Sequence, residues 1–191
     1  MRKFSLKMAA LAVILISAIP ARASDTYSFG FTSSQKKLEG EQKTNGDEII
    51  SREQWAYNVT IENKCFRDLE NLEIQYIIFM KPEIPGQKML SGHVELKRKS
   101  GSTSIKFFKK YDKFPFTTES MELTGTQLSG GYYWGNGANQ NAKDALKGIW
   151  VRVFADGKQV AEYANPATIT SKEHWDEPKK SPKKGKLNSG S

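Results

Sequence analysis

The stretch WAYNVTIENKCFRDLENLEIQYIIFM, residues 55–80, decides the fold. In its first part every second residue is apolar: Trp55, Tyr57, Val59 and Ile61. This alternation predicts a β-strand with one buried face. In its last part a second strand has one continuous apolar face, formed by Leu72, Ile74, Tyr76, Ile78 and Met80. The opposite face of this second strand begins with Glu73 and Gln75 and becomes apolar at Ile77 and Phe79. We therefore expect it to start at an edge and to end covered on both sides.

Further strand patterns follow along the chain. HVELK (residues 93–97) and TESMELT (118–124) alternate over a short distance. GIWVRVF (148–154) places Ile149, Val151 and Val153 on one face. Asp156-Gly157 then separates this pattern from the next one, and both residue types tolerate the positive φ that a type I′ hairpin turn requires. A hairpin is predicted there, and a simple turn at residues 44–48.

Helix signals are few. NQNAKDALKG (139–148) has the pattern of a short helix closed by Gly148, and Thr170 and Glu173 have capping-box spacing. Many short strands with frequent turn signals and almost no helix predict an all-β fold, an antiparallel Ig-like β-sandwich with one or two short helical turns. This domain is expected to span residues 24–175.

The two ends of the chain are expected to lie outside the domain. Arg2, Lys3 and Lys7 precede the apolar run 8–19, and residues 21–23 read Ala-Arg-Ala. This arrangement is typical of a secretory signal peptide, residues 1–23, so the protein is predicted to be exported to the periplasm, the outer membrane or the medium. The lysine-rich segment 176–191 has the composition of a disordered tail, either solubilising or in contact with anionic envelope polymers. Most of the net charge of +8 lies in these ends.

Two runs carry a family resemblance. WAYNVTIENKCFRDLENLEIQYIIF reads as a strand, Asn-Lys, phenylalanine, D-L-x-N-L and a second strand, and DALKGIWVRVFADGKQVAEYANP precedes a tryptophan at 175. Both resemble exported Ig-like β-sandwich proteins of the Planctomycetes–Verrucomicrobia group, including the small Ig-like proteins associated with the type IV pilus-like gene cluster of Akkermansia. The resemblance implies an accessory role in the envelope. A self-polymerising pilin is not expected, because no long apolar helix follows Ala23.

Residues for catalysis are sparse. The only histidines are His93 and His174, without the spacing of metal ligands, and neither a nucleophile elbow nor a phosphate-binding loop is present. The single cysteine, Cys65, fits a buried apolar position, with intermolecular pairing as the alternative. We predict a non-enzymatic protein without cofactor or metal. A hydrolase that uses paired carboxylates is the alternative that the residue types allow.

A basic stretch is the first candidate binding site. Seven basic residues lie between positions 97 and 113: Lys97, Arg98, Lys99, Lys106, Lys109, Lys110 and Lys113. Ser100–Ser104 has the composition of a hairpin loop, which would bring both basic arms together and concentrate positive potential. Docking on an anionic glycan, a lipid headgroup surface or an acidic protein face is one interpretation. A solvated hairpin whose lysines deter strand pairing is the other.

An aromatic loop is the second candidate. Tyr132, Tyr133 and Trp134 lie among glycines and amides such as Asn136. Such rings stack on sugars or anchor protein interfaces, but they also cap an open end of a core. The function predicted from the sequence is an interaction module of the envelope, accessory to a pilus-like system, and a carbohydrate-binding protein is the alternative. Envelope or pilus-system proteins are the expected partners, nucleic acid is not, and a homo-oligomer remains open.

Overall fold

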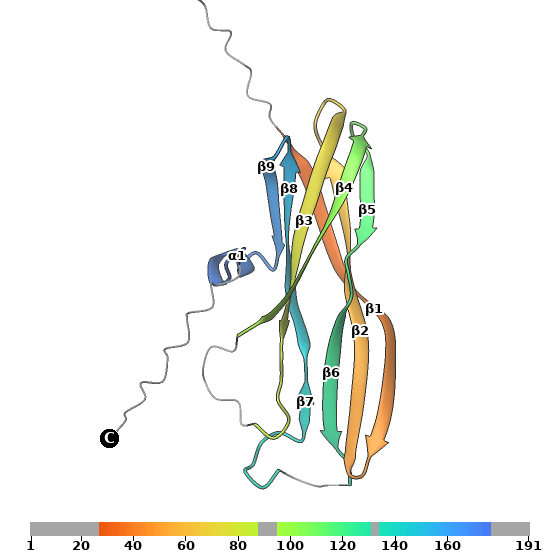
Figure 1. Ribbon diagram of the computed structural model, residues 1–191, viewed down its shortest axis with the longest axis vertical. Helices are drawn as coiled ribbons and strands as arrows, with labels where there is room; N and C mark the ends of the chain where they lie inside the picture. Colours follow the sequence, from red (N-terminus) through yellow and green to blue (C-terminus); the bar gives the residue numbers. More distant parts are fainter. Residues whose placement is uncertain (1–26, 88–94, 131–133, 177–191) are drawn as a thin grey trace, which may run out of the picture.

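Figure 1 shows the computed structural model, which describes residues 27–87, 95–130 and 134–176. Most of this part of the chain is β-strand, arranged as two antiparallel sheets. The predicted all-β sandwich is confirmed, and the one helix in the described residues is the single turn α1 (Ile169–Lys172). The predicted leader, residues 1–23, and all of the predicted tail beyond Asp176 lie outside the described residues.

Each sheet combines strands that are distant in the sequence. The first sheet has the order β1–β2–β6–β7, and β5 pairs with β2 beyond the end of β6. Its strands are β1 (Phe29–Asn45), β2 (Glu48–Asn63), β5 (Lys113–Thr117), β6 (Met121–Leu128) and β7 (Asn141–Lys143). The second sheet has the order β4–β3–β8–β9. Its strands are β3 (Leu69–Lys81), β4 (Lys97–Phe108), β8 (Ala145–Ala155) and β9 (Lys158–Asn165).

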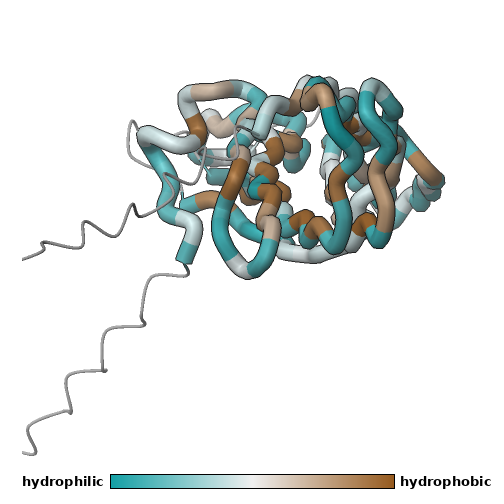
Figure 2. The backbone as a smooth tube through the Cα atoms, turned by 90° about the horizontal axis from the view of Figure 1, so that it is seen from above, coloured by the Kyte–Doolittle hydropathy of each residue, from teal (hydrophilic) through white to brown (hydrophobic). Residues whose placement is uncertain are grey.

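The core lies between the two sheets. The predicted apolar face of β3 is at most 4% exposed along its length, at Leu72, Ile74, Tyr76, Ile78 and Met80. Alternate residues of β2 and β8 pack against it from the two sheets, among them Tyr57, Val59, Ile61, Ile149, Val151 and Val153. Seen from above, hydrophobic residues recur along the strands of both sheets (Figure 2). Burial of each such side chain contributes about 1.5–3 kcal/mol, so this layer is the main stabilising feature.

A smaller apolar cluster covers the outer face of the second sheet. Ile77 and Phe79 of β3 and Trp150 of β8 pack there against Ile169 of α1. The ring of Trp175 meets that of Trp150 edge to face, with centroids 5.3 Å apart. The second half of β3 is therefore covered on both sides, as its sequence predicts. The prediction that β3 starts at an edge is wrong, because β3 lies between two strands: β4 pairs with it from Leu69 and β8 pairs with it from Leu72.

The basic stretch is not a hairpin. β4 runs without interruption from Lys97 to Phe108, so Ser100–Ser104 is the middle of a strand and the predicted loop there is wrong. Close packing explains one of its small residues, Gly101. Gly101 pairs with Tyr76, whose ring occupies the space that a Cβ at Gly101 would need. The predicted strand HVELK is also misplaced: β4 begins at Lys97, Glu95 and Leu96 precede it, and His93 lies outside the described residues.

Both helix predictions need correction. Residues 139–148 form β7 and the start of β8 instead of a helix, because strands β6 and β3 pair with them. The helical turn near residue 170 exists, but its N-cap is Thr168 without a side-chain bond, so the capping box is wrong. Glu173 instead closes the end of α1 and pairs with Arg98.

The turns were predicted more reliably than the polar strands. The β8–β9 hairpin is confirmed, with positive φ at Asp156 (50°) and Gly157 (73°). The turn at residues 44–48 is confirmed as the β1–β2 connection. β1 itself was missed, because its residues from Ser34 to Asn45 are exposed on both faces and show no apolar alternation. β5 was missed too, since its five residues include Pro115.

The contact between Gly101 and Tyr76 yields a first prediction. Gly101→Ala places a methyl group in the space of the Tyr76 ring, whose hydroxyl oxygen accepts a hydrogen bond from the Glu119 N–H (2.9 Å). We expect a loss of about 1–3 kcal/mol in the free energy of unfolding, measured by urea denaturation. Ser104→Ala, an exposed position of the same strand, is the control and should change stability little. Equal stability of the two variants would contradict the packing reason.

Candidate functional site

Asn63, the last residue of β2, joins the two connections at one end of the sandwich. Its side chain is fully buried, at 0% exposed. Nδ2 donates a hydrogen bond to the carbonyl oxygen of Arg67 (3.1 Å) in the connection from β2 to β3. It also donates to the carbonyl oxygens of Phe108 (3.1 Å) and Lys109 (3.0 Å), where β4 ends. Oδ1 accepts a hydrogen bond from the Cys65 N–H (2.9 Å). One amide thus connects both segments.

Backbone and carboxylate contacts complete this junction. The Asn63 N–H donates to the Asp112 carbonyl (3.0 Å), and the Tyr111 N–H donates to the Asn63 carbonyl (2.9 Å). The Asp68 carboxylate accepts a hydrogen bond from the Lys110 N–H (2.8 Å). The β2–β3 loop, residues 64–68, and the β4–β5 turn, residues 109–112, are therefore held side by side. We call these two segments together with the adjoining Phe107 the loop end; it lies at the top of Figure 1.

Cys65 supports the loop end from inside. Its side chain is 4% exposed, which confirms the predicted buried position. Sγ accepts a hydrogen bond from the Ser28 N–H (3.2 Å), and the Lys64 N–H donates to the Ser28 carbonyl (2.9 Å). The start of β1 is thereby attached to the same end of the molecule.

Three aromatic rings at the loop end point into solvent. Phe66 is 90% exposed, Tyr111 is 54% exposed and Phe107 is 52% exposed. The rings of Phe66 and Tyr111 meet edge to face, with centroids 6.0 Å apart. Tyr111 has a left-handed backbone, with φ of 61°. Packing in the core does not explain why large apolar side chains stand at these positions. Exposed apolar groups that lie together often mark contact surfaces.

Basic groups surround the rings. Lys64, Lys109 and Lys110 are exposed, and the Arg67 guanidinium lies 5.2 Å from the centroid of the Tyr27 ring. The carboxylates within the two segments are engaged with the backbone: Asp68 with the Lys110 N–H, as above, and Asp112 with the N–H of Lys113 (2.8 Å). The loop end therefore combines exposed aromatic surface with positive charge.

The structure separates the seven basic residues that the sequence groups together. β4 has 12 residues at about 3.3 Å each, so its two ends lie far apart. Lys106, Lys109, Lys110 and Lys113 lie at or beside the loop end. Lys97, Arg98 and Lys99 lie at the opposite end of β4. The predicted meeting of two basic arms is wrong.

Two of the three basic residues at the start of β4, Arg98 and Lys99, have structural contacts. Arg98 pairs with Glu173 (2.6 Å) and donates to the His174 carbonyl (2.7 Å). Lys99 donates to the Ser120 carbonyl (2.7 Å) and pairs with Glu119 (3.3 Å). These contacts fasten β4 to α1 and to the segment before β6.

The described part of the aromatic loop packs inward. Trp134 is half-buried, and its ring lies against Gly86, at which a Cβ would come within 3.2 Å of the indole. Asn136 donates to the Gly86 carbonyl (2.5 Å) and accepts from the Ala138 N–H (2.9 Å). Tyr132 and Tyr133 lie outside the described residues. A role of this loop in glycan binding stays a prediction.

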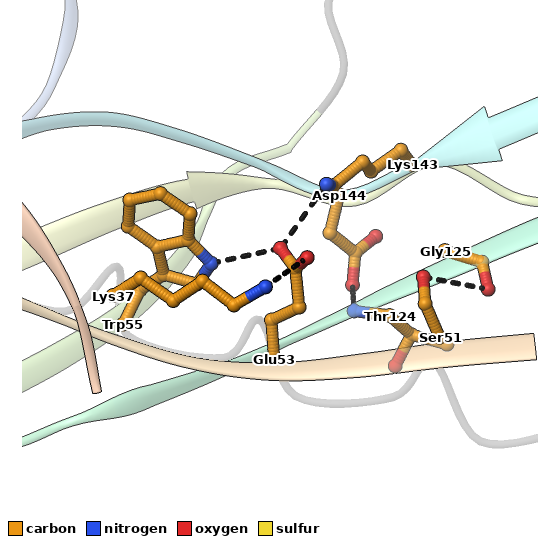
Figure 3. Close-up of polar contacts among 8 residues, drawn as sticks. All are labelled: Lys37, Ser51, Glu53, Trp55, Thr124, Gly125, Lys143 and Asp144. Atoms are coloured by element: carbon orange, nitrogen blue, oxygen red, sulfur yellow. Dashed lines mark hydrogen bonds and ion pairs between the residues drawn. The ribbon is translucent and has the colours of Figure 1, made fainter. Parts of the chain in front are cut away.

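A carboxylate and two lysines lie on the inner face of the first sheet (Figure 3). Glu53 is 13% exposed and accepts hydrogen bonds from Lys37 (2.7 Å) and the Trp55 indole (2.9 Å). Lys143 pairs with it at 3.1 Å. These interactions, with the bond from Lys37 as the largest cause, lower the pKa of Glu53 from its ordinary value of 4.5 to about 2.

Asp144 is a second buried carboxylate nearby, 9% exposed. It accepts hydrogen bonds from the backbone N–H groups of Glu83 (2.9 Å) and Thr124 (3.0 Å). The Asp144 carboxylate thereby joins the segment after β3 to β6. These two strands lie in different sheets and do not pair with each other.

Glu53 and Asp144 both line a hollow of about 350 Å³. A paired-carboxylate hydrolase requires one carboxyl that donates a proton near neutral pH. Glu53 is unsuited to that role, because its lowered pKa keeps it ionised. Its contacts instead fit a structural role.

In the part of the chain that the structure describes, no three His, Cys, Asp or Glu side chains gather as a metal ion would require. No helix within these residues has the length and apolar character needed to span a membrane.

Comparison with known proteins gives a distant structural similarity. No family model matches the chain, and no curated protein does. Its structure is similar to that of the putative ApaA protein from Bordetella pertussis, at 10% identity and a TM-score of 0.35, over 72% of this chain and 92% of that one. It is also similar to the structural genomics target SoR45, at 12% identity and a TM-score of 0.33, over 62% of this chain and 83% of that one.

A crystal structure of a protein from Akkermansia muciniphila is a further similar fold, at 13% identity and a TM-score of 0.21. The match covers 71% of this chain and 70% of that one. At these scores the similarity carries no argument about function.

The most exposed ring of the loop end, that of Phe66, was not predicted as a site residue from the sequence. Phe66 lies in the run NKCFRD between two strands, where an apolar residue outside the alternating pattern was the available signal. Lys64 and Arg67 lie in the same run and were not predicted as site residues either. Of the basic stretch, only the second half lies at the loop end.

Asn63 provides a test of how the loop end is built. Asn63→Ala removes the side-chain hydrogen bonds to the carbonyl oxygens of Arg67, Phe108 and Lys109 and to the Cys65 N–H. We expect a loss of about 2–4 kcal/mol in the free energy of unfolding by urea denaturation. Asn58→Ala, an exposed asparagine of the same strand, is the control and should cost less than about 1 kcal/mol. A loss for Asn63→Ala no larger than that for Asn58→Ala would refute the role of this amide.

The lowered pKa of Glu53 predicts a pH dependence. Because this pKa is lower in the folded than in the unfolded chain, the ionised carboxylate stabilises the fold above about pH 4.5. That stabilisation is lost as the pH falls toward 2. Glu53→Gln should therefore be less stable than the parent at pH 7, and the difference in urea midpoint should disappear near pH 2. Glu39→Gln, an exposed carboxylate on β1, should show no such trend. A difference that stays constant with pH would contradict this account.

Proposed function

We propose that this protein is an exported, non-enzymatic interaction domain of the cell envelope that docks on an anionic envelope component through the loop end. The observation that carries the proposal is the group of exposed rings Phe66, Phe107 and Tyr111 among exposed lysines. Aromatic residues are enriched among the residues that dominate binding at contact surfaces, and complementary charge speeds and orients the association.

The construction of the loop end supports this proposal. Its two segments are ordered by a buried amide and by backbone bonds, so the rings and charges are held in place before any partner arrives. A preorganised surface loses less entropy on binding than a flexible one. The leader that the sequence predicts supports the proposal, because export would bring the protein to the compartment where such an envelope component is found.

The finer role that we propose is that of an accessory protein of a type IV pilus-like system. It is supported by the resemblance of residues 55–79 and 144–166 to exported proteins of that kind. Pilus or secretion proteins would then be partners of the docked domain.

Charge reversal at the loop end tests the docking. The chain from Ser24, which contains every described residue, is incubated with envelope of its source at low and high salt and sedimented. Lys109→Glu with Lys110→Glu should lower the bound fraction about tenfold at low salt, since both side chains are exposed and basic. Lys147→Glu with Lys172→Glu makes the same charge change at exposed positions away from the loop end and should bind like the parent.

Two results would contradict the proposal. If both double variants bind like the parent, the loop end is not the docking surface. The proteins retained with the bound chain test the accessory role separately. Pilus or secretion components that disappear with the loop-end variant support it, whereas the absence of any specific protein argues against it.

A further inference from the structure

We infer that the loop end binds the surface of an anionic lipid membrane, with Phe66 and Tyr111 entering the interface and the lysines contacting lipid phosphates. The inference rests on the proposed function, because it names the chemical class of the component on which the domain docks. It concerns a peripheral contact at the headgroup level.

The exposed rings are suited to a lipid interface. Phe66 is 90% exposed at the tip of the β2–β3 loop, and Tyr111 lies beside it on the β4–β5 turn. Aromatic side chains prefer the headgroup region of a bilayer, where an apolar body and a polar tip are both accommodated. Because no part of the fold covers Phe66, its transfer from water to the interface needs no rearrangement of the domain.

The charges complement these rings. Lys64 and Arg67 flank Phe66 in the sequence, and Lys109 and Lys110 immediately precede Tyr111. Each basic group near an anionic membrane is attracted to its surface potential, and the attraction adds to the burial of apolar area. Each of the two short segments thus carries both an exposed ring and basic residues, so one end of the domain offers both interactions.

The course of the chain favours a membrane over an acidic protein. Tyr27, the first described residue, contacts Arg67, so the polypeptide enters the domain at the loop end. The sequence places the apolar leader, residues 8–19, shortly before this point. A leader engages the membrane during export. The predicted leader would therefore bring the loop end, and not the opposite end of the sandwich, toward the membrane during export.

Binding to protein-free vesicles tests the inference. The chain from Ser24 to Ser191 is sedimented with vesicles of phosphatidylcholine and with vesicles of an equal mixture of phosphatidylcholine and phosphatidylglycerol. We expect binding to the mixed vesicles that weakens with salt, and little binding to the neutral ones. Phe66→Ser should weaken the binding about tenfold, since it removes a ring that is buried only in the bound state.

Matched variants separate this contact from other causes. Ile84→Ser removes an apolar side chain that is 57% exposed in the segment after β3 and should bind like the parent. Phe66→Trp should retain binding and add a fluorescence that shifts to the blue with mixed vesicles. All variants keep the basic tail, so a difference between them reports on the loop end. Urea denaturation of Phe66→Ser should match the parent, because an exposed ring contributes little to stability.

The outcomes distinguish this inference from the proposed function. Binding to envelope without binding to mixed vesicles overturns the lipid inference and indicates a protein or glycan partner, while the docking role stands. Equal vesicle binding by the parent and Phe66→Ser also overturns it. Binding to neither envelope nor vesicles overturns both.

Discussion

The buried amide of Asn63 is the interaction on which the organisation of one end of this sandwich depends. A single side chain, 0% exposed, satisfies backbone groups from the β2–β3 loop and from the end of β4. The β2–β3 loop and the turn after β4 each connect one sheet to the other, so the amide holds both crossings together at this end. A buried polar group is stable only when its hydrogen bonds are made, and here the same bonds hold exposed aromatic and basic residues in place.

Between the two sheets, the interior is apolar toward the loop end and polar toward the opposite end. Around Tyr57, Val59 and Ile61 the inner face of β2 is packed against β3 and β8. Toward the other end of β2 the same face carries Glu53, which is neutralised by Lys37 and Lys143. The Glu53 carboxylate is nearly buried, but both lysine side chains are about half exposed, so these ion pairs contribute less to stability than the apolar packing does. The loop end is thus built on the apolar half.

The sequence predicted the inner strands well and the outer ones poorly, for a physical reason. β3 and β8 are covered on at least one face along their length, so burial imposes an alternation that is visible in the residues. β1 and β7 are held by backbone pairing with a neighbour, and backbone hydrogen bonds leave no mark on side-chain composition. Ser100–Ser104 resembled a loop because small residues serve close packing against Tyr76 as well as turns.

By itself the sequence determined the all-β class, the two faces of β3 and β8, and the β8–β9 turn, because these follow from local alternation and local backbone preference. It also located basic and aromatic residues as candidates for contact. Only the tertiary structure decided which of them meet. It brought Phe66 next to Tyr111 across more than forty intervening residues, and it placed Arg98 and Lys99 in structural contacts far from Lys109. Exposure and proximity across sheets depend on how distant strands pair, and no local pattern records that pairing.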